Sequence, residues 1–505
     1  MKRIALVYPS IYEAALSSLV FHMIYFMINT KYDEVFVERF VLEKLHGAEP
    51  EPRSLETNSP LKDFDVIIAS LHYEPDYVNL LRILLAGGIE VDRKKRRKPL
   101  LFVGGPAPMS NPMPLKNIVD GVLIGEAEEL IPVLVEEYLS NDDKSSLLQA
   151  LDSKKGFYIP EIDNTTERVW VKNINETFYP ITQIQSLDRE PVYGRGFLLE
   201  TARGCPRWCR FCLEGRLFKP FRTRSKTVLK KLVDKGLNLN NLNRVIIYSL
   251  FFPSENDVWL LEYLNGLGVK ASLPSMRLDA INDNVLELIK DIGQKTITIA
   301  PENVSMKGLY AFCKCFRNQD IWDKPFTIID KGFDLKMYFI LGFKGESIDD
   351  VKTNIDYIKR IAKHAKSRKR GLSVTVNPLV PKPKTPFQWI GMIDLERAKQ
   401  IISYTRNELR GLVDTRPLYV NWAWIQASIA LADESIGRIL VEWAIEGGGL
   451  GGWRRVLRRT GYSTKYVFTG RKYGETLPWD KVVLGEYVEE VVEKEYIVLK
   501  KLLGL

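Results

Sequence analysis

Short apolar, β-branched runs alternate with helix-length segments along the chain, and this alternation restricts the fold more than any other feature. In about the first 135 residues, five runs have the length and composition of buried strands, and each is separated from the next by enough residues for a crossover. The pattern predicts an open, mostly parallel α/β sheet. The five runs are Ile4–Tyr8, Val35–Phe40, Val66–Leu71, Leu100–Val103 and Val122–Ile124.

A second alternation begins near Phe197 and continues for about 190 residues. Six strand-like runs with helix-length segments between them predict a six-fold (β/α) partial barrel. These runs are Phe197–Thr201, Val245–Tyr248, Ala271–Leu273, Thr296–Ile299, Leu335–Leu341 and Leu372–Val376.

We therefore expect an α/β fold in which an N-terminal open parallel-sheet domain precedes the barrel and a helical extension follows it. The expected divisions are a domain at residues 1–150, a linker region at 151–192, the barrel at 193–392 and a mainly helical C-terminal domain at 393–505. A length of 505 residues agrees with about three domains. The net charge of +9 fits an anionic partner without requiring one, and five cysteines in this length exclude a disulfide scaffold.

The segment from Ala14 to Thr30 contains no Asp, Glu, Lys or Arg, but its 17 residues only reach the lower limit for a membrane span. Because it closely follows a strand and polar residues interrupt it, we predict a buried first helix and no integral membrane segment. The chain opens without a signal-peptide pattern. We expect a cytoplasmic protein, with peripheral membrane association as an additional possibility.

Three of the five cysteines, Cys205, Cys209 and Cys212, fall within eight residues directly after the first predicted barrel strand. Thiolates this close on one loop can reach a single metal centre, and three of them leave one coordination position unfilled. A closed structural zinc site normally needs a fourth Cys or His. Structural zinc is the weaker alternative, because the chain has four histidines and no second cysteine pair of suitable spacing nearby.

This spacing resembles the signature of the radical S-adenosylmethionine (SAM) superfamily. The resemblance implies that Cys205, Cys209 and Cys212 hold a [4Fe–4S] cluster whose fourth iron binds SAM. In that family one electron from the reduced cluster cleaves SAM and yields a 5′-deoxyadenosyl radical that abstracts a substrate hydrogen. The implied partner is a reductant, ferredoxin or flavodoxin-like.

Other positions follow from the same resemblance. Phe211 matches the aromatic position beside the adenine of SAM. Ser249 follows the second barrel strand, where the family usually has a glycine-and-glutamate turn that binds the SAM amino group. Glu302 closes the fourth strand and is our candidate for a SAM contact, with stabilisation by a helix N-terminus as the alternative. Gly342–Glu346 looks like the family's turn after the fifth strand, where its role can be loop geometry alone.

The α/β domain in front of the barrel resembles the cobalamin-binding subclass. Gly104 with Gly105, and Gly125 with Glu126, match that subclass's turns beside the corrin ring and its nucleotide tail, although plain turn geometry explains these glycines about as well. The loop Pro9–Ala15 contains no histidine, which excludes a protein histidine ligand to cobalt from this loop. Bound cobalamin is one alternative, and a vestigial domain that packs on the barrel is the other. Near the C-terminus, Leu477-Pro478-Trp479-Asp480 resembles a small uncharacterised branch of the subclass.

The resulting hypothesis is a radical SAM enzyme for cobalamin-linked methyl transfer to an unactivated carbon, or for C–C bond formation or cyclisation. Two alternatives remain: modification of a membrane lipid or tRNA without bound cobalamin, and a non-catalytic iron–sulfur protein acting in electron transfer or RNA binding. A lipid is slightly favoured over tRNA or a peptide, because the first helix is apolar and the tail is aromatic and basic. The tail residues concerned are Trp422, Trp424, Trp443, Trp453, Arg454, Arg455, Arg458 and Arg459.

Several further residues have simpler interpretations. Cys313 and Cys315 are expected on a helix, where residues two apart do not face each other, so a shared metal is not favoured. His22 is expected to be a core histidine, as is His72 unless it contacts a ligand at the end of the third strand. The basic run Arg93–Lys98 is expected to be a solvated loop rather than a nucleic-acid site.

Overall fold

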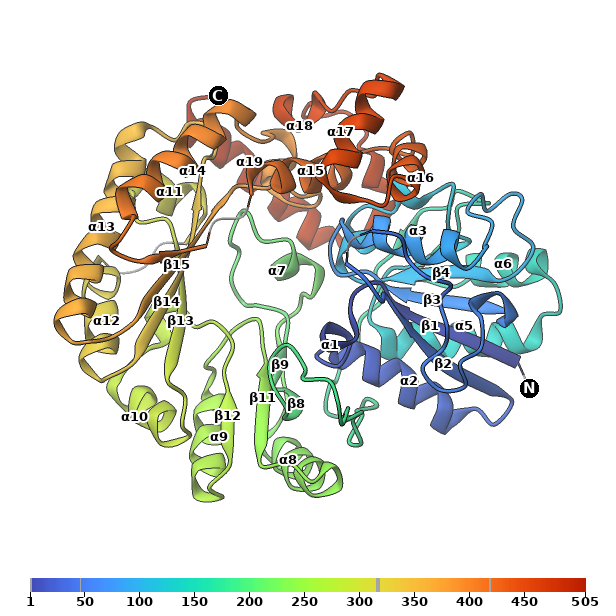
Figure 1. Ribbon diagram of the computed structural model, residues 1–505, viewed down its shortest axis with the longest axis horizontal. Helices are drawn as coiled ribbons and strands as arrows, with labels where there is room; N and C mark the ends of the chain where they lie inside the picture. Colours follow the sequence, from blue (N-terminus) through green and yellow to red (C-terminus); the bar gives the residue numbers. More distant parts are fainter. Residues whose placement is uncertain (1, 46, 315–317, 417–418) are drawn as a thin grey trace. The chain divides into compact units, whose positions relative to one another are not determined.

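The computed structural model describes residues 2–45, 47–314, 318–416 and 419–505 (Figure 1). The chain divides into two compact units, which we call the N-terminal unit and the barrel unit, and each draws on three segments of the chain. The N-terminal unit comprises Met1–Arg195, Ser428–Thr464 and Gly474–Glu489, and the barrel unit comprises Gly196–Ala427, Lys465–Tyr473 and Glu490–Leu505.

The N-terminal unit contains the open parallel sheet that the sequence predicts. Its strand order is β2-β1-β3-β4-β5-β6, and every neighbouring pair is parallel except β5 and β6. Strand β6 lies in the predicted linker region and was not foreseen. The strands are β1 (Lys2–Tyr8), β2 (Val35–Val41), β3 (Val66–Ser70), β4 (Leu100–Gly104), β5 (Gly121–Leu123) and β6 (Phe157–Tyr158).

Helices bury one face of this sheet because successive strand residues point to opposite sides. Ile4, Ile68 and Phe102 belong to one apolar core with helices α2 (Leu19–Lys31), α5 (Ala127–Ser140) and α6 (Lys144–Asp152). The predicted buried first helix is therefore confirmed. Within the described residues, the structure contains no helix whose length and apolar character would let it cross a bilayer.

The barrel unit contains the six predicted strands in chain order. Parallel sheets β12-β11-β8 and β13-β14-β15-β16 form its wall, and a single bridge between Met276 and Ile299 connects the first sheet's end to β13. Helices follow the strands in alternation (Figure 1). The six strands are β8 (Phe197–Glu200), β11 (Arg244–Tyr248), β12 (Lys270–Ser272), β13 (Thr296–Glu302), β14 (Asp334–Leu341) and β15 (Leu372–Pro378). A further short strand that was not predicted, β16 (Asp414–Thr415), pairs with β15.

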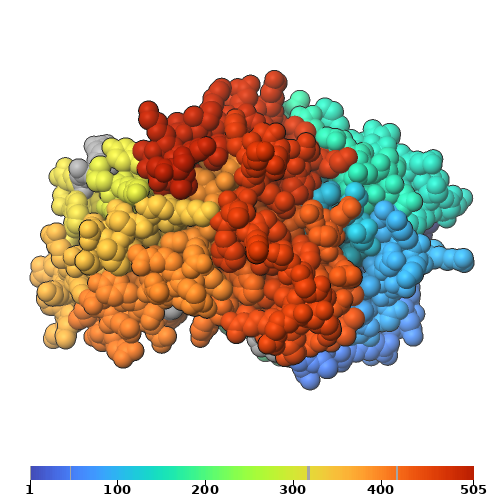
Figure 2. Space-filling view, turned by 90° about the horizontal axis from the view of Figure 1, so that it is seen from above, coloured from blue at the N-terminus to red at the C-terminus, as the bar shows by residue number. Residues whose placement is uncertain are grey.

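The C-terminal tail differs from the expected separate domain, because its segments are divided between the two units. Helices α16 (Ile436–Ile445) and α17 (Gly449–Thr460) belong to the N-terminal unit, where Trp443 and Trp453 are fully buried with ring centroids 5.1 Å apart. The end of α19 (Glu486–Leu503) belongs to the barrel unit. In Figure 2 this dark red end lies at the surface beside yellow and orange atoms. The described part of the tail is therefore shared between the two units.

Two of the cations in the basic run are structural rather than solvated. Arg93 and Arg96 are buried, and Arg96 Nη2 donates to Asp120 Oδ2 at 2.8 Å, with neither side chain accessible to solvent. Arg96 Nη2 also donates to the carbonyl oxygen of Ile118 at 2.6 Å. The expectation of a solvated loop is therefore wrong for these two of the six residues, whereas Lys94, Lys95, Arg97 and Lys98 are exposed.

Candidate functional site

The cysteine loop lies at the carboxyl end of the first barrel strand, as predicted. It runs from β9 (Ala202–Arg203) to α7 (Glu214–Leu217), and β9 pairs with β10 (Arg222–Thr223) to close its base. The loop begins at Gly204, whose φ is +79° and whose Cβ position would lie 2.2 Å from the carbonyl oxygen of Phe218. Only glycine fits there, because a side chain would collide with the main chain of Phe218 and Pro220 between α7 and β10.

An ion-pair network fixes the base of this loop. The carboxylate of Glu200 accepts from Arg203 Nε at 2.8 Å and from Arg224 Nη2 at 2.7 Å. Although burial works in the opposite direction, these two guanidiniums lower the pKa of Glu200 to about 2. The carboxylate is therefore ionised at neutral pH. It connects the end of β8 to Arg203 of β9 and to Arg224, the residue that follows β10.

Two cations hold the cysteine carbonyls. Arg216, with 1% of its surface exposed, donates from Nη1 to the carbonyl oxygens of Cys209 at 2.6 Å and Cys212 at 2.8 Å. Lys219 donates from Nζ to the carbonyl oxygen of Cys205 at 2.6 Å. Each cysteine of the motif thus has its main chain fixed by a charge-assisted hydrogen bond.

The thiols of Cys205 and Cys212 are partly buried, and this burial favours their protonated forms. Burial raises the pKa of Cys205, and it raises the pKa of Cys212 to about 12 although the Gly215 N–H donates to its Sγ at 3.3 Å. Metal binding must therefore displace protons from these thiols. Among the described residues, no group of three or more His, Cys, Asp or Glu side chains is arranged to hold a metal ion, so the cysteines do not form a complete set of metal ligands by themselves.

The donor set on this loop nevertheless fits an iron–sulfur cluster. Three sulfur donors from one loop are the soft ligands that iron–sulfur clusters take. Arg216 supplies positive charge close to Cys209 and Cys212. Its Nε and Nη2 atoms are buried and have no hydrogen-bond partner within the described part of the chain. A buried guanidinium with spare donors can offset the negative charge that bound thiolates carry.

Phe211 lies where the loop meets the aromatic core of the barrel unit. Its ring makes an edge contact with Phe312, with centroids 5.3 Å apart and an interplanar angle of 74°. The neighbouring Arg210 donates its backbone N–H to the carbonyl oxygen of Phe312 at 3.0 Å and forms an ion pair with Glu495 of α19. The loop is therefore fastened to both α19 and the turn that contains Phe312.

Lys314 connects Phe211 with Glu302. Glu302 ends β13 with a φ of +63°, and its Oε1 accepts from Lys314 Nζ at 3.0 Å, with only 12% and 8% of the two side chains exposed. The same Nζ lies 5.9 Å from the ring centroid of Phe211. Helix α11 (Met306–Ala311) has Ser305 as its N-cap, so Glu302 lies outside the first helical turn and the helix-dipole alternative is wrong.

Ser249 follows β11 as predicted, but its hydroxyl is engaged locally. Ser249 Oγ donates to the carbonyl oxygen of Phe251 at 2.8 Å and accepts from the Phe251 N–H at 3.2 Å. These bonds shape the turn after the strand. A role for Ser249 toward SAM stays a prediction.

The predicted residues of the N-terminal unit are in contact with the chain's own backbone. The Cβ position of Gly105 lies 2.3 Å from the Leu71 carbonyl oxygen, and that of Gly125 lies 2.3 Å from the Val169 carbonyl oxygen. Glu126 is buried, and its Oε2 accepts from the Val171 N–H at 3.0 Å. Close packing therefore explains these three positions.

Gly104 is different, because the nearest atoms to its Cβ position are Leu123 Cβ at 3.5 Å and the Leu123 carbonyl oxygen at 3.9 Å. A side chain there would make an ordinary van der Waals contact. Contact of Gly104, Gly105, Gly125 or Glu126 with a cofactor stays a prediction.

Polar side chains on the inner face of the barrel were missed by the sequence analysis. The Phe339 ring contacts Tyr357 of α13 (Ile348–Ser367), so this face of β14 is turned toward the helices. The alternate residues Lys336 and Tyr338 therefore point into the barrel, with Lys336 Nζ 5.1 Å from the Tyr338 ring centroid. They are partly exposed, as is Thr375 on β15. The alternation of polar and apolar residues in these predicted strands is the signal that could have found them.

A buried carboxyl lies in the turn after β14. Glu346 Oε2 accepts from the Gly342 N–H at 2.5 Å, and Oε1 accepts from Asn303 Nδ2 at 3.1 Å. Burial raises the pKa of Glu346 to about 8. Asn303 also accepts from Asn354 Nδ2 at 2.9 Å, so the network joins the ends of β13 and β14 to α13. The Gly342–Glu346 turn thus has a structural function.

The remaining histidine and cysteine expectations have mixed outcomes. His22 is a satisfied core histidine, bonded to Leu16 at 3.0 Å and Ile184 at 3.1 Å, and burial lowers its pKa to about 4. His72 is exposed after β3, with its ring 5.3 Å from that of Tyr8, so the core expectation for it is wrong.

Cys313 lies not on a helix but in a turn with φ of +51°, and Cys315 lies outside the described residues.

Two family models match the two parts of the chain. Residues 199–358 match the radical SAM superfamily, and residues 20–160 match the N-terminal part of radical SAM proteins. An uncharacterized protein of Methanocaldococcus jannaschii, MJ0966, is 30% identical over 449 residues, which cover 87% of this chain and 91% of that protein. The chain belongs to the radical SAM superfamily. Its cofactors are accordingly a [4Fe–4S] cluster and SAM, and it depends on a reductant.

The fold is also that of cobalamin-dependent members of the superfamily. The chain is similar to the radical SAM methyltransferase TsrM of Kitasatospora setae, solved with cobalamin and a [4Fe–4S] cluster. That match has a TM-score of 0.51 and 12% identity, and covers 74% of this chain and 72% of TsrM. It is similar as well to the cobalamin-dependent radical SAM enzyme OxsB, with a TM-score of 0.53 and 12% identity over 100% of this chain and 80% of OxsB. The predicted fold class is confirmed.

Proposed function

We propose that Cys205, Cys209 and Cys212 hold the [4Fe–4S] cluster and that the chain cleaves SAM reductively for hydrogen abstraction from an unactivated carbon. The observation that supports this best is the loop itself, in which Arg216 and Lys219 bind all three cysteine carbonyls. When bound, the cluster and SAM supply a 5′-deoxyadenosyl radical, and the protein supplies binding, orientation and electrostatics.

The residues around the loop have distinct functions in this proposal. Phe211 and Phe312 exclude water from one side of the loop through their edge contact. Glu302 has one carboxylate oxygen bound by Lys314, and its other oxygen accepts from the amino group of SAM. Lys314 fixes the direction of that carboxylate. Both side chains are almost buried, which makes such a contact stronger than it would be in water.

We place the substrate in the barrel, against Lys336, Tyr338 and Thr375. A lining with an ammonium, a phenol and a hydroxyl group suits a substrate with polar groups. The apolar first helix and two of the tail tryptophans no longer favour a lipid, since α2 buries apolar residues against the sheet and Trp443 and Trp453 are core residues. The tail arginines are exposed. The reaction in this proposal is methyl transfer, or C–C bond formation or cyclisation.

The proposal extends to cobalamin on the N-terminal unit, where the support is the fold shared with TsrM and OxsB. Strand order β2-β1-β3-β4-β5 places the first, third and fourth strand ends at one edge, the usual ligand side of such sheets. The spaces beside Gly105 and Gly125 are filled by Leu71 and Val169, so these turns provide no cradle, and we derive no chemical step through a corrinoid. Corrinoid absorbance after purification from cells grown with hydroxocobalamin tests this part.

The test of the main proposal is SAM cleavage by the anaerobically reconstituted protein. With dithionite and SAM, the protein should release 5′-deoxyadenosine, measured by liquid chromatography and mass spectrometry. The control is the triple variant with Cys205, Cys209 and Cys212 changed to Ala. An intact cluster without SAM cleavage would leave a non-catalytic iron–sulfur protein, and a bound zinc ion in place of iron would overturn the site assignment.

The reaction type needs a separate measurement. SAM with a deuterated methyl group transfers its label to the product only in methyl transfer. Untargeted comparison of lipids and modified nucleosides in a strain that lacks this chain identifies the molecule that receives the label.

A further inference from the structure

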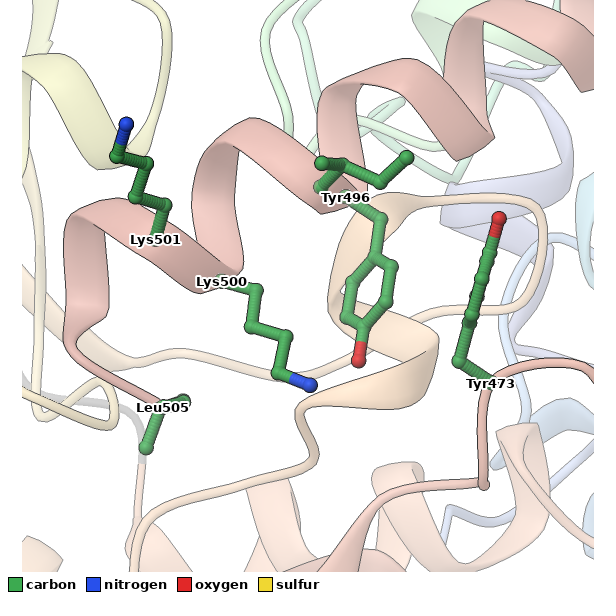
Figure 3. Close-up of a pocket in the computed structure, with 6 residues that line it drawn as sticks. Tyr473, Tyr496, Lys500, Lys501 and Leu505 are labelled. Carbon is green, nitrogen blue, oxygen red and sulfur yellow. The ribbon is translucent and has the colours of Figure 1, made fainter.

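The surface at the end of α19 contains an open hollow of about 460 Å³ in the barrel unit. Figure 3 shows Lys500 and Tyr496 pointing into it from the helix, with the ring of Tyr473 beside Tyr496. Residues that line it or adjoin it expose large apolar surfaces: Ile497 is 58% exposed, and Leu505 is 54% exposed. Exposed apolar patches with charged residues beside them are typical of interaction sites.

This surface also carries two lysines at the end of α19, one helical turn or more beyond the exposed Glu493. Lys500 and Lys501 are exposed in the last turn of α19, and neither forms an ion pair within the described part of the chain. Figure 3 shows Lys501 projecting from the helix in another direction from Lys500, so the two amino groups flank the end of the helix. A partner with a negative surface would be attracted to this end of α19.

The inner face of the same helix contacts the cysteine loop. Glu495 forms an ion pair with Arg210, the residue after the second cysteine. Tyr496, Leu499 and Leu503 belong to one apolar core, against which Phe211 of the loop is packed. An α-helix with its side chains is about 10–12 Å across. The outer surface of α19 is therefore separated from the cysteine loop by about one helix diameter.

Aromatic rings occupy the space between this surface and the loop. Tyr473 lies 5.0 Å from Tyr496, and Tyr496 lies 4.8 Å from Trp389, between ring centroids. On the loop side, Phe312 lies 6.0 Å from Phe387 and 5.3 Å from Phe211. Phe387 and Trp389 belong to the same 3-10 turn, η4 (Pro386–Trp389). Two groups of packed rings, joined through the main chain of η4, thus lie between the exposed patch and the cysteine loop.

We propose that this face of α19, formed by Tyr473, Ile497, Lys500, Lys501 and Leu505 around the largely buried Tyr496, docks a small acidic protein of the ferredoxin type that delivers electrons to the cluster. The inference rests on the proposed function, because it requires a cluster on the cysteine loop. In the step, one electron leaves the reduced carrier, which is oxidised, and enters the cluster, which is reduced. Weak electron-transfer complexes bury small interfaces and are steered by charge, which agrees with a short apolar patch beside two lysines.

The experiment reverses the charge of the patch and compares a protein donor with a chemical one. The test variant is Lys500→Glu with Lys501→Glu in the full chain. The matched control is Lys231→Glu with Lys235→Glu, which changes two exposed lysines of α8 (Lys226–Asn240) in the same unit and shifts the net charge equally. The probe is an acidic two-cluster ferredoxin, and its affinity is measured by titration calorimetry at low and high salt.

We expect the test variant to bind the ferredoxin roughly tenfold more weakly than the wild type at low salt, and the control to bind it nearly as well as the wild type. With limiting ferredoxin, 5′-deoxyadenosine release should fall in the test variant alone. With dithionite, both variants should match the wild type. An Ile497→Ser variant, which leaves the charge unchanged, should also weaken ferredoxin binding.

Equal ferredoxin affinity in the wild type, test variant and control would overturn the docking site. This outcome differs from failure of the proposed function, in which dithionite and SAM would give no 5′-deoxyadenosine in any of the proteins. Melting temperatures of the variants identify loss of folding, and in that case Lys500→Met with Lys501→Met provides the same comparison without introduced carboxylates.

Discussion

Arg216 Nη1 lies 2.6 Å from the carbonyl oxygen of Cys209, and the guanidinium that makes this bond is buried beneath the cysteine loop. The same atom reaches Cys212, so one side chain fixes the main chain at two of the three sulfur donors. Its remaining nitrogens Nε and Nη2 are buried without a hydrogen-bond partner in the described part of the chain. Arg216 is therefore both a positioning residue and a local source of positive charge.

We expect Arg216→Met to weaken iron binding by roughly 10–100-fold, as is typical when a residue that orients metal ligands is removed. The midpoint potential of the cluster should also fall, because the reduced, more negative state loses a nearby cation. Arg216→Lys keeps the charge but not the planar pair of donors. The midpoint potential of the cluster should therefore change less in this variant than in the Met variant.

Iron content at limiting iron and an electron paramagnetic resonance redox titration measure these two effects. Arg207→Ala is the control, because Arg207 is on the same loop with its side chain 49% exposed. Wild-type iron affinity and potential in the Met variant would show that Arg216 acts on neither.

The three cysteines of the motif should differ from the nearby Cys313 in their effect on the cluster. Three single variants, Cys205→Ala, Cys209→Ala and Cys212→Ala, should each lose iron and sulfide, and each should lack the broad visible absorbance after reconstitution. Cys313→Ala should retain the cluster, since Cys313 lies in the turn after α11 and not on the loop. Loss of the cluster in Cys313→Ala, with the fold intact, would contradict this assignment of ligands.

Most strands of the two main sheets were predictable because they coincide with apolar, β-branched runs. Observed bounds such as Val66–Ser70 and Asp334–Leu341 differ from the predicted ones by one residue at an end. Strand β6 was missed because its two residues carry no periodicity. The division of the tail between two units was not predictable either, since the apolar face of a helix does not reveal which core receives it.

The site was predictable only where spacing defines it. Cys205, Cys209 and Cys212 are recognisable from their separation, whereas nothing in the sequence distinguishes the buried Arg216 from the exposed Arg207. Lys314 is the last residue before the segment 315–317, which lies outside the described range, and the turn after α11 brings it to Glu302. Such partners come from tertiary packing, which local patterns do not record.

The ion pair between Glu302 and Lys314 should be required for the stability of the barrel unit. Lys314→Met leaves the Glu302 carboxylate largely buried without its cation, and we expect a loss of about 3 kcal/mol. Glu302→Gln combined with Lys314→Met removes the unpaired charge and should recover most of this loss. Thermal unfolding of the three proteins measures both effects. A double variant no more stable than Lys314→Met would contradict the uncompensated charge as the cause.

Glu346 makes the folded state sensitive to alkaline pH. Burial raises its pKa from the ordinary 4.5 to about 8, so between these values the folded chain holds a proton that the unfolded chain releases. The contribution of this group to the free energy of unfolding is thus fully present below about pH 4.5, and it falls as the pH rises toward 8. Glu346→Gln, which cannot ionise, should lose less melting temperature between pH 5.5 and 8.5 than the wild type. The same change at the exposed Glu262 should leave the wild-type pH dependence unaltered, and an identical slope in Glu346→Gln would exclude Glu346 as its source.

Substitutions at two neighbouring glycines of the N-terminal unit, Gly104 and Gly105, distinguish a role in packing from a contact with the cofactor. Gly105 has a φ of +110°, and a Cβ there would lie 2.3 Å from the Leu71 carbonyl oxygen, whereas a Cβ on Gly104 would lie 3.5 Å from Leu123. We therefore expect Gly105→Ala to lower the melting temperature whether or not hydroxocobalamin is present, because the strain is within the chain. Gly104→Ala should fold normally.

Because Gly104 has room for a methyl group, a loss of corrinoid binding in Gly104→Ala at unchanged stability would identify a cofactor contact that packing does not explain. A Gly105→Ala protein as stable as the wild type would contradict the structural explanation and return that turn to the candidate ligand site.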